Sequence, residues 1–241
     1  MDIFLKNTSS QYPPPPPDNS FGPSYTSVMF TSAKRKYCYA GFNLIGCVDG
    51  SQSEMFYSQR YDLVDITRQS LQLIAVDIYY EVLSGYHNKS KTEVQTASTK
   101  LFQLFTDMDA ILSSNQYFLL GRWLNSAKKL ATNAQESKLY EYNARNQITL
   151  WGPRGNIDDY ANKMWGGLVN SYYKPRWQLF ESFLLDAIAH GTSFDSSKFN
   201  AAVLKQETQW THDTSSFPDS PVGDTSAIAK NLHAKYRPKK Y

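Results

Sequence analysis

Long hydrophobic runs are missing from this sequence of 241 residues. No stretch approaches the roughly 18 apolar residues of a membrane-spanning helix, and residues 1–10 contain no apolar core of a secretory signal. We therefore expect no membrane span, and no signal peptide is visible in the chain. Hydrophobic residues still make up 41% and charged residues 20% of the chain, which is the composition of an ordinary globular protein.

Cysteine is scarce, with only Cys38 and Cys47. These two residues could close one small loop in an oxidising compartment or stay free thiols, and the sequence favours neither state. The four histidines are scattered singly, and no Cys/His cluster has the spacing of a zinc site. We therefore predict no metal and no other cofactor.

An excess of charge of one sign is also missing, because 25 Lys and Arg residues oppose 22 Asp and Glu residues. The small basic excess lies mostly in two short runs, at 34–36 and 235–240, and neither run follows one face of a periodic helix. Proteins that bind nucleic acid usually show a basic stripe or patch. We therefore expect no nucleic-acid partner.

The common catalytic motifs are missing as well: the sequence has no G-x-S-x-G, Walker, HExxH or G-x-G-x-x-G pattern. Carboxylates are plentiful near the centre of the chain, including Glu141, Asp158, Asp159 and Glu181. The sequence does not tell whether any two of them face each other at the roughly 5 to 10 Å that glycosidases use. We assign no catalytic residue, and whether the chain alone is an enzyme stays open.

Residues 1–56 differ from the rest of the chain in composition and in hydrophobic pattern. They contain the run Pro13–Pro17, many Ser and Thr residues and no sustained helical period. A proline run favours polyproline II and could be a ligand for a proline-recognition module, although an extended lead-in is the favoured interpretation. We predict a disordered or poorly structured segment over 1–56 and one domain over 57–241.

From residue 57 onward, apolar residues recur at helical spacing. The pattern predicts helices over 61–84, 101–112, 120–130 and 135–149. A further helix should start at Asn156, with Asp159 completing a capping box, should be interrupted at Pro175 and should then continue to Gly191. Two more helices are expected, one over 199–210 and a last short one over 224–236. The predicted fold is all-α, with about seven helices in a single domain.

The loop after Gly85 contains an N-glycosylation sequon, Asn88-Lys89-Ser90. Such sequons also occur by chance in proteins that never meet the glycosylation machinery. If the chain enters the secretory route, we expect Asn88 to carry a glycan. A second sequon starts at Asn7, in the proline-rich segment, and we give it less weight because of that position.

The most unusual stretch lies between residues 147 and 163. Glycine and proline residues form a tight turn there that carries Trp151 and Asn156, with Tyr160 just beyond. A Trp face beside amide and hydroxyl groups suits a sugar, whose apolar C–H face packs on the indole while polar groups bind its hydroxyls. A helix–helix corner with a simply buried Trp explains the same residues equally well.

Several long motifs occur in one order along the chain and together resemble the C-terminal helical domain of the α-N-acetylglucosaminidases. The motifs cover much of the stretch from about residue 57 to 236, and residues before 57 match nothing that we can place in the family. They are Arg60–Gln69, Phe118–Leu124, Tyr140–Arg145, Ile148–Ile157, Asp159–Lys163, Tyr172–Trp177, Pro221–Thr225 and Lys235-Tyr236.

The resemblance implies a retaining glycoside hydrolase that removes terminal α-linked N-acetylglucosamine, in animals from heparan sulfate in the lysosome. In this family both catalytic glutamates belong to a preceding TIM-like barrel, and the helical domain packs on that barrel and helps to wall the substrate pocket. This sequence contains no counterpart of the barrel. The implied partners are therefore the barrel and a glycan that ends in N-acetylglucosamine, and the implied localisation is the lysosome or the secretory route.

The resemblance carries over two groups of residues. Four would face the substrate pocket or the barrel: Trp151, Asn156, Asp159 and Tyr160. Two would be structural anchors: Arg176 and Trp177. The alternative is a freestanding, non-catalytic helical module that binds a sugar or a protein partner. An autonomous glycosidase that uses its own carboxylates is the least favoured hypothesis.

Overall fold

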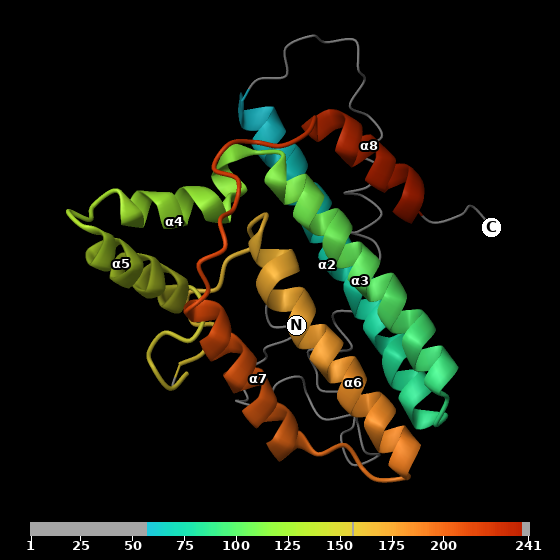
Figure 1. Cartoon of the computed structure of the whole chain (residues 1–241). Coiled ribbons are helices and arrows are strands. Elements are labelled where there is room, and N and C mark those ends of the chain that lie inside the picture. Colours follow the sequence, from blue (N-terminus) through green and yellow to red (C-terminus); the bar gives the residue numbers. More distant parts are fainter. Residues whose placement is uncertain (1–56, 156, 238–241) are drawn as a thin grey trace.

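The computed structural model describes residues 57–155 and 157–237 (Figure 1). Within these ranges the chain forms seven α-helices and two short helical turns, with no β-strand, so the all-α prediction is confirmed. None of the described helices is long and apolar enough to cross a membrane. The expectations for residues 1–56, including those for Cys38, Cys47 and the sequon at Asn7, lie outside the described residues.

The two longest helices, α2 (Tyr57–His87) and α3 (Lys91–Ser113), form a tight antiparallel hairpin. The turn between them is short because Lys89 adopts a left-handed backbone conformation with φ of 53°. Helix α3 begins ten residues before the predicted position 101. The segment 91–100 is mostly polar and buries few residues, among them Val94 and Ala97, so its periodic signal in the sequence is weak.

A second hairpin, formed by α4 (Leu120–Lys128) and α5 (Ala134–Gln147), projects to the left in Figure 1. The 3₁₀ turn η1 (Gln116–Phe118) leads into it from α3. The side chain of Asn133 caps α5 by accepting the backbone N–H of Glu136. The Trp123 indole N–H donates to the Ala144 carbonyl at 2.9 Å, which joins the two helices of this hairpin.

The prediction of a helix that starts at Asn156 is wrong. Residues 157–161 form turns, and the chain becomes helical only near the π-helical turn η2 (Val169–Tyr173). Asn156 itself lies outside the described residues. Asp159 has a left-handed φ of 57° and does not cap a helix, because its carboxylate forms an ion pair with Arg176, far along the chain. A tertiary contact therefore overrides the local capping signal.

Helix α6 (Lys174–His190) follows directly on η2, with Pro175 in its first turn. The interruption predicted at Pro175 thus takes the form of a π-helical turn just before the proline. Proline cannot donate a backbone hydrogen bond, and the start of a helix is where that donor is least needed. The predicted end of the helix before Gly191 is confirmed, since Gly191 ends α6 with a left-handed φ of 64°.

The last two helices are α7 (Ser196–Thr211) and α8 (Thr225–Tyr236), capped by the side chains of Asp195 and Asp224. The linker 212–224 passes beside α4 and α5 before it reaches α8, which packs on α2 and α3 (Figure 1). One contiguous hydrophobic core connects α2, α3, α6 and α7. At its centre lie the buried aromatic rings of Tyr79, Phe105, Trp177, Phe180 and Phe199.

Candidate functional site

The candidate site is the Trp151 loop, which we define as the described residues 149–155 and 157–161 between α5 and η2. The Asp159 N–H donates to the Thr149 carbonyl at 2.6 Å, which joins the two ends of the loop, and the Trp151 N–H donates to the Asn146 carbonyl of α5 at 2.8 Å. The Asn146 side-chain oxygen accepts the Gly152 N–H at 2.7 Å. Hydrogen bonds within the loop and to Asn146 at the end of α5 therefore hold the loop in place.

Two of the predicted pocket residues, Trp151 and Tyr160, meet on the outside of this loop. Their ring centroids are 5.3 Å apart, with the ring planes inclined by 60°. Tyr160 is 73% exposed, and Trp151 is half-buried. Trp151 has a φ of 50°, a conformation that L-residues rarely adopt and that sets the direction of its side chain. The Trp is therefore not simply buried in a helix corner.

Asp159 lies on the opposite side of the loop and is only 2% exposed. One of its carboxylate oxygens is 2.9 Å from a guanidinium nitrogen of Arg176 on α6. The other accepts a long hydrogen bond from the Tyr172 hydroxyl, at 3.5 Å. The side chain of Asp159 therefore ties the loop to α6 and η2 and does not line a pocket beside the aromatic pair.

Arg176 is the centre of a buried ionic cluster. Its guanidinium contacts Asp159, Asp158 at 3.5 Å and Glu207 on α7, and it stacks on the ring of Tyr172 at 4.8 Å. Arg176 is 4% exposed and Glu207 is 2% exposed. The cluster joins the Trp151 loop to η2, α6 and α7 in an environment where each ion pair is poorly screened.

The pKa of the Glu207 carboxyl is raised to about 8. The main cause is burial, which disfavours the charged form, and the neighbouring Asp158 and Asp159 act in the same direction while Arg176 opposes them. Burial likewise raises the pKa of the Tyr172 hydroxyl well above its usual value. The Glu207 carboxyl therefore takes up a proton more readily than an exposed glutamate does, although Arg176 lies beside it.

The other expected anchor, Trp177, follows Arg176 in α6 but faces the core. Its ring packs edge-on against Tyr79 at 5.6 Å and Phe180 at 5.8 Å between centroids. The two neighbouring residues thus connect the ionic cluster beneath the Trp151 loop with the aromatic centre of the core.

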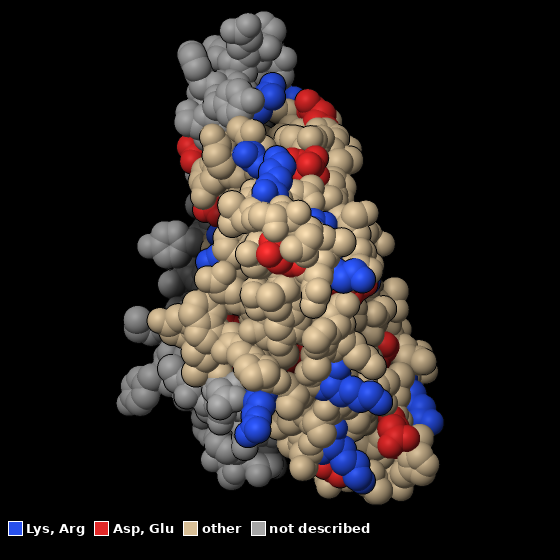
Figure 2. Space-filling model, turned by 60° about the vertical axis from the view of Figure 1, so that its left-hand side comes forward, with Lys and Arg blue, Asp and Glu red and all other residues tan. Residues whose placement is uncertain are grey.

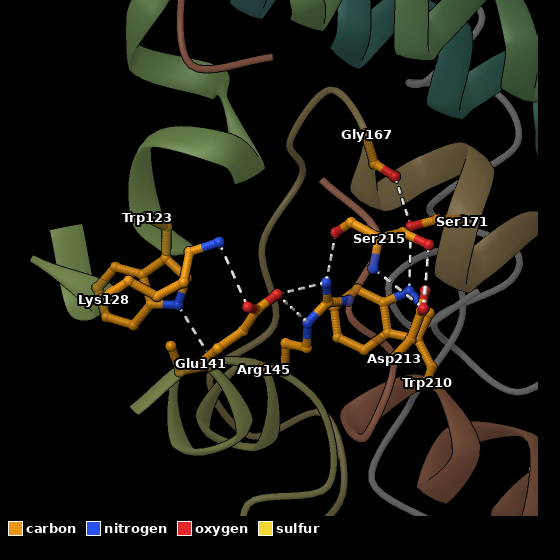
Figure 3. A network of polar contacts seen from close by, with 10 residues as sticks. Trp123, Lys128, Glu141, Arg145, Gly167, Ser171, Trp210, Asp213 and Ser215 are labelled. Carbon is orange, nitrogen blue, oxygen red and sulfur yellow. Dashed lines mark hydrogen bonds and ion pairs between the residues drawn. The ribbon is translucent and has the colours of Figure 1, made fainter. Parts of the chain in front are cut away.

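Sequence reasoning missed a second network, which is centred on Arg145 at the end of α5 (Figure 3). Arg145 is fully buried, pairs with Glu141 at 2.8 Å and donates to the Ser215 carbonyl at 2.7 Å. Its guanidinium lies over the rings of Trp210 and Phe217, 4.8 and 5.5 Å from their centroids. The network therefore fixes the base of the Trp151 loop against the linker 212–224.

An open groove of about 600 Å³ lies apart from the loop, between α3, η2 and the linker 212–224. Phe217, Val222 and Ile228 give it apolar walls. At its edge the Asp109 carboxylate accepts the backbone N–H groups of Gly167 and Asn170, at 2.9 and 3.0 Å. Burial raises the pKa of the Asp109 carboxyl. Among the described residues, no group of three or more His, Cys, Asp or Glu side chains could hold a metal ion.

The described residues thus form a helical domain that carries an aromatic pair on a loop. The model of one family, the α-N-acetylglucosaminidase (NAGLU) C-terminal domain, matches residues 35–235. This chain therefore belongs to the α-N-acetylglucosaminidase C-terminal domain family. The match begins before residue 57, and the domain boundary at 57 stays a prediction.

Known proteins agree with this assignment. Human α-N-acetylglucosaminidase is 41% identical over 181 residues, which is 75% of this chain and 24% of that protein. Two solved structures of a family 89 glycoside hydrolase from Clostridium perfringens are 27% identical, one in complex with 2-acetamido-1,2-dideoxynojirmycin and one with its substrate GlcNAc-α-1,4-galactose. Their TM-scores are 0.67 and 0.65, over 74% and 72% of this chain and 21% and 20% of the other. The chain thus spans about a quarter of the length of its human relative.

Proposed function

We propose that this chain forms one wall of the substrate pocket of an α-N-acetylglucosaminidase-type glycoside hydrolase. It would contact a catalytic barrel, which is not among these 241 residues. The substrate is a glycan of the heparan sulfate type that ends in α-linked N-acetylglucosamine, and the protein works in the lysosome or along the secretory route. The catalytic carboxylates belong to the barrel, and this chain supplies binding surface.

The observation that carries this proposal is the pair of Trp151 and Tyr160 on a loop that is anchored from below. A sugar ring can pack its C–H face on the indole, with the phenol hydroxyl beside it as a hydrogen-bonding group. Because the Arg176 cluster already orders the loop, little conformational entropy is lost when the sugar binds. The acids in the loop and beside it, Asp158, Asp159 and Glu207, all pair with Arg176 and do not form a catalytic pair in the proposal.

The surroundings of the loop also support the proposal. Exposed apolar side chains lie in the loop and beside it: Ile157 in the loop is 48% exposed, and Leu204 of α7, next to Gly155, is 39% exposed. Figure 2, which brings the α4–α5 side of the molecule forward, shows acidic and basic side chains interspersed among broad uncharged areas. An uncharged surface with scattered charges suits a lasting contact with a neighbouring domain.

The test is a chimaera in which this chain replaces the matched portion of human α-N-acetylglucosaminidase. We expect the chimaera to hydrolyse an aryl α-N-acetylglucosaminide, and Trp151→Ala to lower its kcat/KM at least about tenfold, the loss of roughly 1.4 kcal/mol of transition-state binding. The matched control is Tyr80→Ala, which removes an aromatic residue that is 49% exposed on α2, and it should leave kcat/KM unchanged. A folded, active chimaera that tolerates Trp151→Ala would contradict the proposal.

The freestanding alternative makes a different prediction for the same surface. A non-catalytic module would bind a sugar or a protein partner as the 241-residue chain alone, through Trp151, Ile157 and Tyr160. Calorimetric titration of the chain with GlcNAc-α-1,4-galactose distinguishes the two functions. Binding by the chain alone at micromolar concentration favours the module, whereas activity of the chimaera without such binding favours the pocket wall.

A further inference from the structure

The turn between α2 and α3 is the most exposed part of the long hairpin. His87, Asn88, Lys89 and the first residues of α3 are all exposed, and only Ser90 among them is half-buried. The backbone of the turn is fully hydrogen-bonded, with the Asn88 N–H donating to the Ser84 carbonyl at 2.9 Å and the Ser90 N–H to the Gly85 carbonyl at 2.9 Å. The turn is therefore rigid and open to solvent at once.

The side chains of the sequon have distinct roles in this turn. The Asn88 amide nitrogen donates to a carboxylate oxygen of Glu93 at 2.9 Å. The Ser90 hydroxyl oxygen accepts the backbone N–H of Glu93 at 3.3 Å and caps α3. A primary amide carries two N–H groups, so a substituent on the Asn88 nitrogen replaces one of them and leaves the other for Glu93.

We propose that Asn88 is an N-glycosylation site of this protein. The donor is a lipid-linked oligosaccharide pyrophosphate. The amide nitrogen of Asn88 forms a bond to the anomeric carbon of the sugar, the bond from that carbon to the pyrophosphate oxygen breaks, the lipid pyrophosphate leaves with the electron pair, and the amide gives up one proton to a base of the transferase. This proposal rests on the secretory route given under the proposed function and not on the role of Trp151.

The position of the turn decides which surface a glycan at Asn88 would cover. Figure 1 shows the α2–α3 turn at the lower right end of the hairpin, whereas α5 and the chain that follows it lie on the left, beyond α6. A branched glycan at Asn88 therefore projects away from the Trp151 loop. It also keeps this end of the hairpin in solvent, so that a neighbouring catalytic domain docks elsewhere, as the proposed function requires.

The experiment uses the 241-residue chain behind a cleavable secretory leader in eukaryotic cells. Asn7→Gln removes the second sequon, so that only Asn88 remains. We expect peptide N-glycosidase F to shift the protein by the mass of one glycan and to leave aspartate at position 88 in the peptide map. Because the transfer precedes folding, occupancy is read on all membrane-enclosed material as well as on secreted protein. An unmodified Asn88 in that material overturns the proposal.

Two substitutions at Ser90 separate glycosylation from helix capping. Ser90→Asp keeps a good N-cap but removes the hydroxyl that the sequon needs, so we expect the glycan to be lost with no change in helix content. Ser90→Thr keeps both the hydroxyl and the cap and should stay glycosylated. A glycan that persists at position 88 in Ser90→Asp, or is missing in Ser90→Thr, contradicts the assignment.

Discussion

At the scale of single residues, Arg176 decides how the Trp151 loop is held. Among the described residues, its guanidinium faces the carboxyl groups of Asp158, Asp159 and Glu207 at once. Replacing Arg176 with Met leaves these buried groups without their shared cation. We expect a loss of about 3 to 5 kcal/mol in the free energy of unfolding, the usual result when one member of a buried pair is removed. Urea denaturation followed by circular dichroism measures it. Arg122→Met, at an exposed arginine on α4, is the matched control and should change stability by less than about 0.5 kcal/mol.

Glu207 makes the stability depend on pH. Its pKa is about 8 in the folded chain against an ordinary value of 4.5, so the folded state binds more protons than the unfolded state between these two values. The contribution of Glu207 to stability is therefore fully present below about pH 4.5 and is lost as the pH rises toward 8. Glu207→Gln removes this titration, and we expect a smaller fall in the melting temperature between about pH 5 and pH 8. Asp109, whose pKa is also raised, leaves a residual slope. A variant as pH-dependent as the natural chain would rule out this role of Glu207.

At the scale of helices, Gly85 fixes how closely α2 and α3 cross. A methyl group at this position would lie 2.7 Å from the backbone nitrogen of Val94 and 2.9 Å from the Glu93 β-carbon. Helix propensity alone would favour Gly85→Ala by about 1 kcal/mol. The clash involves backbone at the start of α3, and overpacking of this kind costs about 1 to 3 kcal/mol. We therefore expect Gly85→Ala to lower stability in thermal denaturation, whereas Ser84→Ala, at the exposed neighbouring position, should be neutral or slightly stabilising.

Local signals in the sequence predict those elements whose ends depend on local contacts. Asp224 begins α8 and Gly191 ends α6 as predicted, because caps are made within a few residues of the helix itself. The same reasoning fails at Asp159, whose partner Arg176 is distant in the sequence. Glu207 gives no sequence signal at all, since it stands among polar residues in α7, and only its burial reveals its role.

At the candidate site, too, some features could be predicted from the sequence and others could not. The composition of the turn and the family resemblance both pointed to Trp151 and Tyr160, and the structure brings these two rings together. The left-handed backbone at Trp151 was not predictable, because a bulky residue rarely adopts it. Residues 91–100 extend α3 beyond its predicted start, since packing of Val94 and Ala97 on α2 stabilises a stretch with little apolar pattern of its own.

At the scale of the whole molecule, the core of the described residues gives a way to test the predicted boundary at residue 57. Helices α2 to α8 share one hydrophobic core, and the networks around Arg145 and Arg176 connect the α4–α5 hairpin and α7 to it. We therefore expect a polypeptide of residues 57–241 to unfold in one cooperative transition, with the stability of the full chain.

The family match begins at residue 35, so the informative comparison is a polypeptide of residues 35–241. If the longer polypeptide is more stable by over about 1 kcal/mol, a clear margin for added packing, residues 35–56 belong to the domain and the boundary at 57 is wrong. If the two denaturation curves coincide, the seven described helices are the complete folding unit.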